Sequence, residues 1–560
     1  MADVRLTEPS RPVVNGMLGA TVTALGGLIF EDAPFLRFRW QAANMNRRAR
    51  RAAAASTAAP AGLSPAFVEA FNAGLNAQNE GRLDQAVAAY RKAMLFNPNH
   101  ALLHNNLGVV FYTLGQLEDA VTHYNKAIAI DPNMPLALNN LAVTLNAIDR
   151  HDEAIPIFKR SLKFQPGNPK ALNNLGDSYN KTGRFAEARP LLEQVVAATP
   201  DYAEAISNLG MTMWGLQDLD AAIALFKRAL ALQPDLAMAR KNLGLVYLVI
   251  GNYAEAWREY AWRQVADRIP PRKDLKPLWQ GQDLGGGTLL VFPEQGVGDE
   301  ILYAGMMEDL AKRGIKMLWE ADSRLLSLFQ RSYPGLTFSA RQWPPGSETA
   351  PADVVAQCPV ANLGLFFRND LAQFPKDRGG YLTPEPSRVA ALRAATGVVP
   401  GEKLIGMSWL SKNPRFGENK STSLADWASV IGHPGVRFVD LQYGDTADDR
   451  AAFARATGLN LVHVEGLDLT TDLDGVAALA AACDQVVTVS NSVAHIAAAV
   501  GSKVVVMVPE GMGKLWYWGN GADRTPWYPN VRVLRQMVAN DWRPVMAQVV
   551  DLITELTRQP

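Results

Sequence analysis

The sequence predicts an α-solenoid of helix-turn-helix repeats followed by an α/β region with two Rossmann-like halves. Two observations support this prediction. Several residue types recur at a fixed step of 34 residues between Asn72 and Ala256, and a period of this length indicates stacked pairs of helices. From Thr288 onward, short apolar runs alternate with amphipathic segments, which is typical of parallel strands joined by helices.

Four kinds of residue keep the 34-residue step, and together they are the signature of tetratricopeptide repeats. We expect the small residues to let the two helices of a unit approach closely. We expect each proline to begin the following unit, where a missing N–H is tolerated. The four series are Asn72, Asn106, Asn140, Asn174, Asn208 and Asn242; Gly74, Gly108, Ala142, Gly176, Gly210 and Gly244; Ala86, Ala120, Ala154, Ala188, Ala222 and Ala256; and Pro98, Pro132, Pro166, Pro200 and Pro234.

The six asparagines need a reason of their own, because Asn is a mediocre helix former. One amide per unit makes a ladder along a superhelix, and each amide offers two donors and an acceptor to the backbone of an extended peptide. The alternative is a structural Asn that bonds to the neighbouring repeat. We favour peptide binding, since all six units keep the residue and such solenoids present concave binding surfaces.

Composition limits the classes of function. The chain has 560 residues, which is too long for one core, and 55 basic residues balance 55 acidic ones. A neutral chain argues against nucleic acid as the main partner. The two cysteines, Cys358 and Cys483, lie in apolar contexts, so we expect buried free thiols and a cytoplasmic protein. No Cys/His cluster has metal-ligand spacing, so neither a metal nor a cofactor is expected.

Residues 1–62 differ from the rest. Val13 to Phe30 is largely apolar, but its glycines and polar residues make it a poor membrane span, and no small-residue cleavage site suggests a secretory signal. Six arginines between Arg37 and Arg51 precede an Ala-rich linker. We favour a disordered or partly helical tail. The alternative is a segment that docks on a membrane surface or a partner.

Prolines and the Gly285–Gly287 run mark a linker after the repeats. We therefore expect a tail over 1–62, six repeats over 63–268, a linker over 269–287, and Rossmann-like halves over 288–400 and 401–560. Residues 343–381 read as irregular. The expected strands are Thr288–Pro293, Ile315–Glu320, Lys403–Leu410, Arg437–Tyr443, Leu461–Val464, Gln485–Val489 and Lys503–Val508. The expected helices are Asp299–Arg313, Leu424–Ile431, Asp448–Ala456, Leu473–Cys483 and Ala494–Val500.

Ligands of such sheets bind beyond the carboxyl ends of the strands, where three motifs lie. The first is the Glu294–Glu300 loop, in which Gly296 and Gly298 permit a tight turn and close approach of a ligand. The loop lacks the spacing of a dinucleotide fingerprint and has no Walker lysine. Asp299 places a carboxylate at the mouth of the cleft. An N-terminal cap of the following helix is the alternative role for this residue.

The second motif runs from Ser408 to Ser421 and gathers three cations, Lys412, Arg415 and Lys420. A solvated loop is the alternative, but hydroxyl, amide and cationic side chains concentrate where a phosphate would lie.

The third motif is Thr488–His495, where a strand leads into a helix of small residues. We expect the helix start to present free N–H groups, at Asn491 and Ser492, and a partial positive charge to a phosphate, with Ser490 among the donor-binding residues. His495, on the first turn, is either structural or a ligand contact.

These three motifs resemble the bacterial heptosyltransferase-like branch of type B glycosyltransferases, over roughly Leu284 to Leu556. Order and spacing of the matching pieces agree. Fused to the repeats, the region looks most like bacterial enzymes that glycosylate flagellin on Ser/Thr, and more distantly like O-linked N-acetylglucosamine transferase. The matching pieces are Glu294–Asp299, Ser408–Ser421, Leu441-Gln442-Tyr443-Gly444, Ser490–His495, Trp516-Tyr517-Trp518-Gly519 and Pro526-Trp527-Tyr528-Pro529.

The resemblance implies a nucleotide-sugar as co-substrate, with Gln442 and Tyr443 among the donor-site residues. Asp299 matches the Asp proposed as catalytic base, and the asparagine ladder matches the one that holds the acceptor polypeptide. Many relatives have an Asp at the position of Ser490, so the identity of the donor stays open.

The predicted function is an inverting, metal-independent transfer of sugar to Ser/Thr of an acceptor protein, for which the resemblance implies flagellin. Asp299 is the predicted base, and Lys412, Arg415 and Lys420 stabilise the leaving nucleotide. Two alternatives stay open. The first is a non-catalytic repeat scaffold with a degenerate transferase module, and the second is a transferase that acts on a lipid or polysaccharide.

Overall fold

The computed structural model describes residues 63–267, 269, 276–341, 351–376, 379–413, 417–511, 513–519 and 521–558. The predicted tail over residues 1–62 and Arg415 lie outside the described residues. Contacts divide the chain into two units, residues 1–199 and 200–560, and each unit is described by itself.

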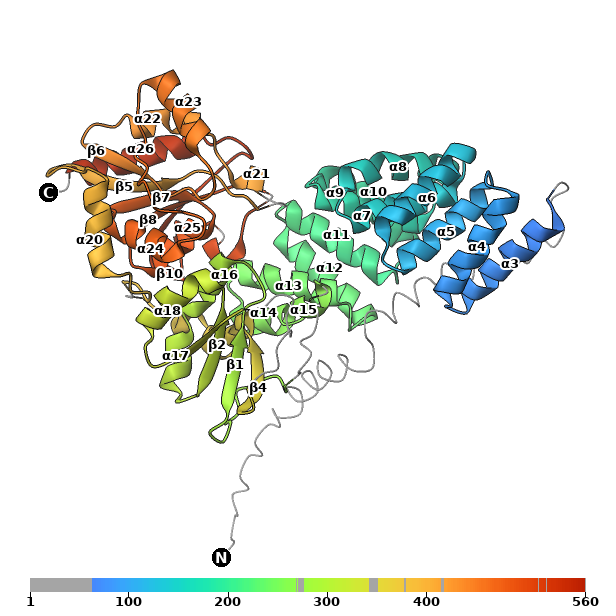
Figure 1. The fold of residues 1–560 in the computed structure, drawn as a ribbon, viewed down its shortest axis with the longest axis horizontal. Helices are drawn as coiled ribbons and strands as arrows, with labels where there is room; N and C mark the ends of the chain where they lie inside the picture. Colours follow the sequence, from blue (N-terminus) through green and yellow to red (C-terminus); the bar gives the residue numbers. More distant parts are fainter. Residues whose placement is uncertain are drawn as a thin grey trace, which may run out of the picture. The chain divides into compact units, whose positions relative to one another are not determined.

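The first unit is a solenoid of four helix pairs (Figure 1). The second unit begins with two more pairs and a short helix, so six helix pairs lie between Pro65 and Tyr260 of the described chain. The first unit contains α3 (Pro65–Asn79), α4 (Leu83–Phe96), α5 (Ala101–Thr113), α6 (Leu117–Ile130), α7 (Pro135–Ala147), α8 (His151–Phe164), α9 (Pro169–Lys181) and α10 (Phe185–Ala198). The second unit begins with α11 (Ala203–Gly215), α12 (Leu219–Leu232), α13 (Ala237–Ile250), α14 (Tyr253–Tyr260) and α15 (Arg263–Ala266).

The repeat glycines lie where the two helices of a pair are in closest contact, as expected. A Cβ on Gly108 would lie 2.6 Å from the ring of Tyr124, and real Cβ atoms do not approach so closely. The expectation for the repeat prolines is wrong. Pro98 lies in the turn between α4 and α5, three residues before α5 begins at Ala101. Turns tolerate a missing N–H as well as the first helical turn does.

The first sheet has four parallel strands in the order β3-β2-β1-β4. Two sequence expectations fail here. The helix expected over Asp299–Arg313 is two helices, because the chain turns at Gly305, and β4 lies inside the segment expected to be irregular. The elements are β1 (Thr288–Phe292), α16 (Val297–Ala304), α17 (Met307–Lys312), β2 (Met317–Ala321), α18 (Leu326–Ser332), β3 (Thr337–Ala340), β4 (Val354–Pro359), α19 (Gly364–Phe367) and α20 (Pro386–Ala395).

The second sheet has six strands in the order β6-β5-β7-β8-β10-β9, parallel except for the β9–β10 pair. The strand expected at Leu461–Val464 is only an isolated bridge from Val462 to Val439. The elements are β5 (Lys403–Ser408), α21 (Gly417–Lys420), α22 (Ala428–Ile431), β6 (Val436–Asp440), α23 (Ala447–Thr457), α24 (Leu473–Ala482), β7 (Gln485–Val489), α25 (Ser492–Ala499), β8 (Val504–Val508), η5 (Trp516–Trp518), β9 (Arg524–Thr525), β10 (Tyr528–Arg535) and α26 (Arg543–Arg558).

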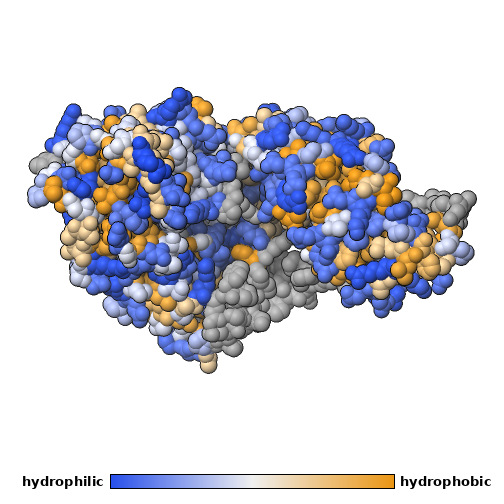
Figure 2. All heavy atoms as spheres, turned by 45° about the horizontal axis from the view of Figure 1, so that its top comes forward, coloured by the Kyte–Doolittle hydropathy of each residue, from blue (hydrophilic) through white to orange (hydrophobic). Residues whose placement is uncertain are grey.

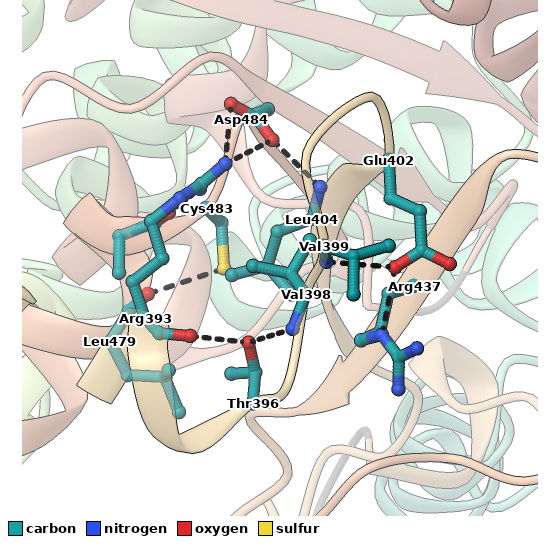
Figure 3. A network of polar contacts seen from close by, with 11 residues as sticks. Arg393, Thr396, Val398, Val399, Glu402, Leu404, Arg437, Leu479, Cys483 and Asp484 are labelled. Carbon is teal, nitrogen blue, oxygen red and sulfur yellow. Dashed lines mark hydrogen bonds and ion pairs between the residues drawn. The ribbon is translucent and has the colours of Figure 1, made fainter. Parts of the chain in front are cut away.

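Helices cover both faces of the second sheet (Figure 1). On one face, α22 and α26 bury a core that includes Trp427, Ile553 and alternate residues of the strands. On the other face lie α24, α25 and α20. Arg393 of α20 bonds to Asp484, which also accepts from the Leu404 N–H at 2.7 Å (Figure 3). Thus α20 precedes residue 401 but packs on the second sheet.

Candidate functional site

The central feature of the site is Asp299, on the first turn of α16 just beyond the carboxyl end of β1. Gly296 is the N-cap and has no side chain to cap with, so Asp299 stands at the third helical position, from which a carboxylate can cap the helix start. Its half-buried carboxylate accepts from the backbone N–H groups of Gly296 and Asp299. Burial raises the pKa of Asp299 to about 6, against the opposing charge of Lys420. A carboxylate with this pKa can take a proton near neutral pH.

Lys420 ends α21 in the second Rossmann-like half and is 5% exposed. Burial lowers the pKa of Lys420, while the charge of Asp299 raises it. Each group therefore acts on the other from a different half of the α/β region. A carboxylate of the first half and an ammonium of the second half thus lie near each other.

Four buried tyrosines feel the charge of Asp299: Tyr260, Tyr303, Tyr517 and Tyr528. Burial is the main cause that raises the pKa of each, and it takes that of Tyr260 to about 12. They come from the last repeat, the first half and the second half. Tyr517 and Tyr528 lie in pieces that matched the family pattern. Sequence reasoning missed Tyr260 and Tyr303, because neither lies in a recognisable motif.

Gly298 and His495 join the two halves. A Cβ on Gly298 would lie 3.0 Å from His495 Cδ2, so the glycine permits α16 to approach α25. The Nδ1 atom of His495 is 3.0 Å from the Tyr528 hydroxyl, and its ring stacks on Trp518 with centroids 5.0 Å apart. Burial lowers the pKa of His495 to about 3, so the imidazole is neutral at physiological pH.

Gln442 and Asn491 hold the loop after β5. The Oε1 atom of Gln442 accepts from the Ser408 hydroxyl at 2.9 Å and from the backbone N–H groups of Trp409 and Leu410 at 3.0 and 2.7 Å. Asn491 donates to Ser408 Oγ at 2.7 Å and to Leu410 O at 2.9 Å. The side-chain amides of Gln442 and Asn491 thus fix the start of this loop through hydrogen bonds to Ser408 and Leu410.

Asn491 also caps α25, because its Oδ1 accepts from the Val493 N–H at 3.0 Å. Ser492 is the first residue of this helix. Ser490 precedes the cap, and its hydroxyl accepts from Trp518 Nε1 at 2.8 Å. The expectation of a free N–H group at Asn491 is wrong, because this N–H donates to Val489 O at 2.8 Å within the turn, and the N–H of Ser490 donates to Met507 O at 3.2 Å within the sheet.

Lys412 and Ser421 stand at the two ends of that loop. Lys412 is exposed, and its N–H donates to the Tyr443 hydroxyl at 2.9 Å. Ser421 accepts from the Ser411 N–H at 2.9 Å and donates to Gly417 O. At Gly296, on the opposite half, a Cβ would meet nothing within 4 Å. The donor role of these residues stays a prediction, and Arg415 lies outside the described residues.

The asparagine ladder is uneven within the first unit. Asn140 is buried and donates to Asn105 Oδ1 of the neighbouring repeat at 3.0 Å. Asn106 reaches the Tyr90 hydroxyl at 3.5 Å. Asn72 is exposed and Asn174 half-buried. In the second unit Asn208 is half-buried and Asn242 buried. At Asn140 the amide performs the structural role weighed as the alternative.

The repeats also expose apolar side chains (Figure 2). Phe96, Ile130 and Phe164 are exposed and end the second helix of three successive repeats.

Among the described residues, no group of three His, Cys, Asp or Glu side chains converges as metal ligands would. Within the same residues, no helix has the length and apolar character needed to cross a membrane.

Comparison with known proteins defines the repeats. Family models described as "Tetratricopeptide repeat" match residues 133–201 and 167–235, and models described as "TPR repeat" match residues 79–115 and 110–149. The chain thus contains tetratricopeptide repeats between residues 79 and 235, and a largely parallel α/β region follows the repeats.

One curated relative covers a longer stretch. The chain is 31% identical over 333 residues to Protein FlbA of Caulobacter vibrioides, which is 55% of this chain and 54% of that protein. It therefore spans about half the length of the relative it matches.

Three solved structures are also similar. YrrB, described as having an unusual peptide-binding site, is 21% identical, with 30% of this chain and 88% of that chain covered and a TM-score of 0.29. MamA is 24% identical, with 31% and 94% covered and a TM-score of 0.29. PilW, a type IV pilus biogenesis factor, is 21% identical, with 37% and 96% covered and a TM-score of 0.33. No functional inference follows from likenesses at these TM-scores.

Proposed function

We propose that this protein is a glycosyltransferase that moves a sugar from a nucleotide-sugar to a Ser or Thr hydroxyl of an acceptor protein bound by the repeats. The observation that supports the proposal is the nearness of Asp299 in the first half to Lys420 in the second, since it sets a carboxylate with a pKa of about 6 beside a cation. Flagellin is the acceptor class implied by the resemblance.

In this mechanism Asp299 accepts the proton of the attacking hydroxyl. The hydroxyl oxygen attacks the anomeric carbon as the bond from this carbon to the nucleotide breaks. The configuration at the anomeric carbon is therefore inverted. A base with a pKa near the working pH combines a large ionised fraction with useful basicity. Burial supplies that pKa, because the ordinary value of an aspartate is about 3.9.

The leaving nucleotide carries the negative charge that develops during the transfer. Lys420 is close enough to act on Asp299, and the N-terminus of α25 adds its partial positive charge and the N–H of Ser492, the first residue of the helix. Fixed positive groups in a partly dry site stabilise such charge without reorganisation. We propose that these groups suffice without a metal. A chelator tests this point, because transfer should persist in EDTA.

The repeats select the acceptor in this proposal. Polar amides at Asn72 and Asn174 are accessible for an extended backbone, whereas Asn140 already bonds within the solenoid. We therefore assign the peptide contact to the accessible members of the ladder.

The test is sugar transfer by Asp299→Asn, measured by the mass gain of an acceptor protein. We expect a loss of about 100-fold or more, since a positioned base contributes about 10²–10⁴-fold, with nucleotide affinity within about 2-fold. Asp353→Asn is the matched control, because Asp353 pairs with Lys316 at the amino end of β4. Transfer by Asp299→Asn at the control rate would remove Asp299 as base. An unaltered chain that adds no sugar to any cellular protein would favour the scaffold.

A further inference from the structure

The end of the last repeat makes polar contacts with the loop that leads to Asp299. Arg263, the first residue of α15, pairs with Glu294 of the Glu294–Glu300 loop. Gln264 donates to the other carboxylate oxygen of Glu294 at 2.9 Å. Gln295 donates to the hydroxyl of Tyr260, the last residue of α14, at 3.0 Å. Three consecutive contacts thus join the end of the solenoid to the start of the loop.

This ion pair is unusually well shielded from water. The side chains of Arg263 and Glu294 are 2% and 1% exposed. Arg263 also donates to Asn362 Oδ1 at 2.8 Å and to Tyr260 O at 3.2 Å. A buried ion pair is weak evidence for stability, since apolar replacements often serve as well. The two side chains must nevertheless stay paired, because a buried charge that loses its partner must move or gain water.

The opposite side of the loop is also anchored. Arg341 donates to the backbone oxygen of Gln295 at 3.0 Å and pairs with Glu300 at 3.1 Å. Glu300 in turn accepts from the Asp322 N–H at 2.8 Å. The loop is held at Glu294, Gln295 and Glu300, and Asp299 lies between these points.

We infer that Arg263 is a positioning residue: through Glu294 it sets the place of the Asp299 carboxylate, so that the last repeat forms part of the catalytic site. This inference rests on the proposed function. Arg263 does not touch the reacting atoms. It acts on the base through the loop, as does Tyr260, which also feels the charge of Asp299.

The first experiment compares Arg263→Met with the unaltered full chain on an acceptor protein. We expect kcat to fall about 10–100-fold, since a small misplacement of a catalytic group costs this much. The KM for acceptor and the affinity for the nucleotide that the unaltered chain binds, among UDP, GDP, ADP and CMP, should stay within about 2-fold. The acid limb of the pH–rate profile should move below pH 6, because a displaced loop lets water reach Asp299. Arg263→Lys, which keeps the charge for Glu294, should recover part of kcat.

Arg240→Met is the matched control. Arg240 pairs with Glu259 at 2.9 Å within the same repeat but does not contact the loop, so its removal should leave the pH profile in place. An Arg263→Met chain with the kcat and pH profile of the control would overturn the inference. So would a parallel loss of kcat, nucleotide binding and thermal stability, because that pattern indicates general damage to the fold.

Hydrogen exchange separates this inference from the proposed function, because it needs no turnover. Peptides covering residues 294–304 should exchange faster in Arg263→Met than in Arg240→Met, while those covering 485–499 should not change. Unchanged exchange at 294–304 would overturn the positioning role even in an active enzyme. A chain that transfers no sugar yet shows the local change would end the proposed function and leave the coupling of repeat to loop standing.

Discussion

At the scale of single residues, the site depends on what burial does to charge. Asp299 and Lys420 are ordinary side chains whose pKa values move toward neutrality because both lose water, and their mutual attraction opposes the shift without cancelling it. His495 is driven further, to a pKa of about 3, and therefore packs as a neutral ring. The same physical cause raises the pKa of the acid and lowers the pKa of the imidazole, since burial disfavours the charged form of each.

The pKa of Asp299 sets the expected pH dependence of transfer. The base is the carboxylate, so kcat/KM should be constant well above pH 6 and fall about tenfold per unit below it. An aspartate with its ordinary pKa would place this limb near pH 4. The measurement is kcat/KM from pH 4.5 to 8 on one acceptor protein, with circular dichroism at each pH to show that the fold persists. A flat profile down to pH 5 would contradict the assignment.

At the scale of elements, glycines decide how closely helices pair. At four of the repeat glycines, a Cβ would collide with a large side chain of the paired helix. Examples are Gly108, which faces Tyr124, and Gly176, which faces Leu192. The fold therefore needs a missing Cβ at these points, and this requirement keeps the 34-residue period visible in the sequence.

Gly108→Ala should destabilise the first unit by about 1–3 kcal/mol, the usual cost of overpacking a filled core. Gly167→Ala is the control, because a Cβ there meets nothing within 4 Å. Thermal and urea unfolding, followed by circular dichroism, measure the difference. Equal stability of the two variants would mean that Tyr124 moves aside at little cost.

The sequence predicted strands correctly where a strand is buried on both faces, because most residues of such a strand are apolar. The strand over Gln485–Val489 has the predicted bounds, and all five of its residues are buried. It failed at Leu461–Val464, where Leu461 and Val464 are buried but only Val462 forms a bridge. An apolar run reports burial, and a loop against a core gives the same signal as a strand.

At the scale of the whole molecule, the second unit combines the last two repeats with both α/β halves. Trp257 of α14 donates to Arg368 O at 2.7 Å. The centroid of its ring lies 5.7 Å from that of Trp516 and 6.3 Å from that of Trp527. Within this unit the end of the solenoid and the two halves share one aromatic core. Ligand binding at the junction should therefore stabilise the unit as a whole.

A nucleotide that occupies the junction should raise the midpoint of thermal unfolding. At a concentration of 100 times Kd the stabilisation is about 2.7 kcal/mol. We expect one of UDP, GDP, ADP and CMP to give this shift, and the double variant Lys412→Ala/Lys420→Ala to lose it. Lys503→Ala is the control, since Lys503 is exposed at the amino end of β8. A shift that survives the double variant would place the nucleotide elsewhere. The absence of any shift in the unaltered chain would favour the scaffold.

The sequence alone determined the repeats, the order of the two architectures and the three loops that meet at the junction, because each is written in local spacing: a period of 34, apolar runs, and glycines after strands. Only the tertiary structure decided that the charge of Asp299 reaches the buried Tyr260 and Tyr303, that Asn140 bonds across repeats, and that Arg263 pairs with Glu294. Burial and ion pairing depend on residues far apart in the chain, and no local pattern records which of them will meet.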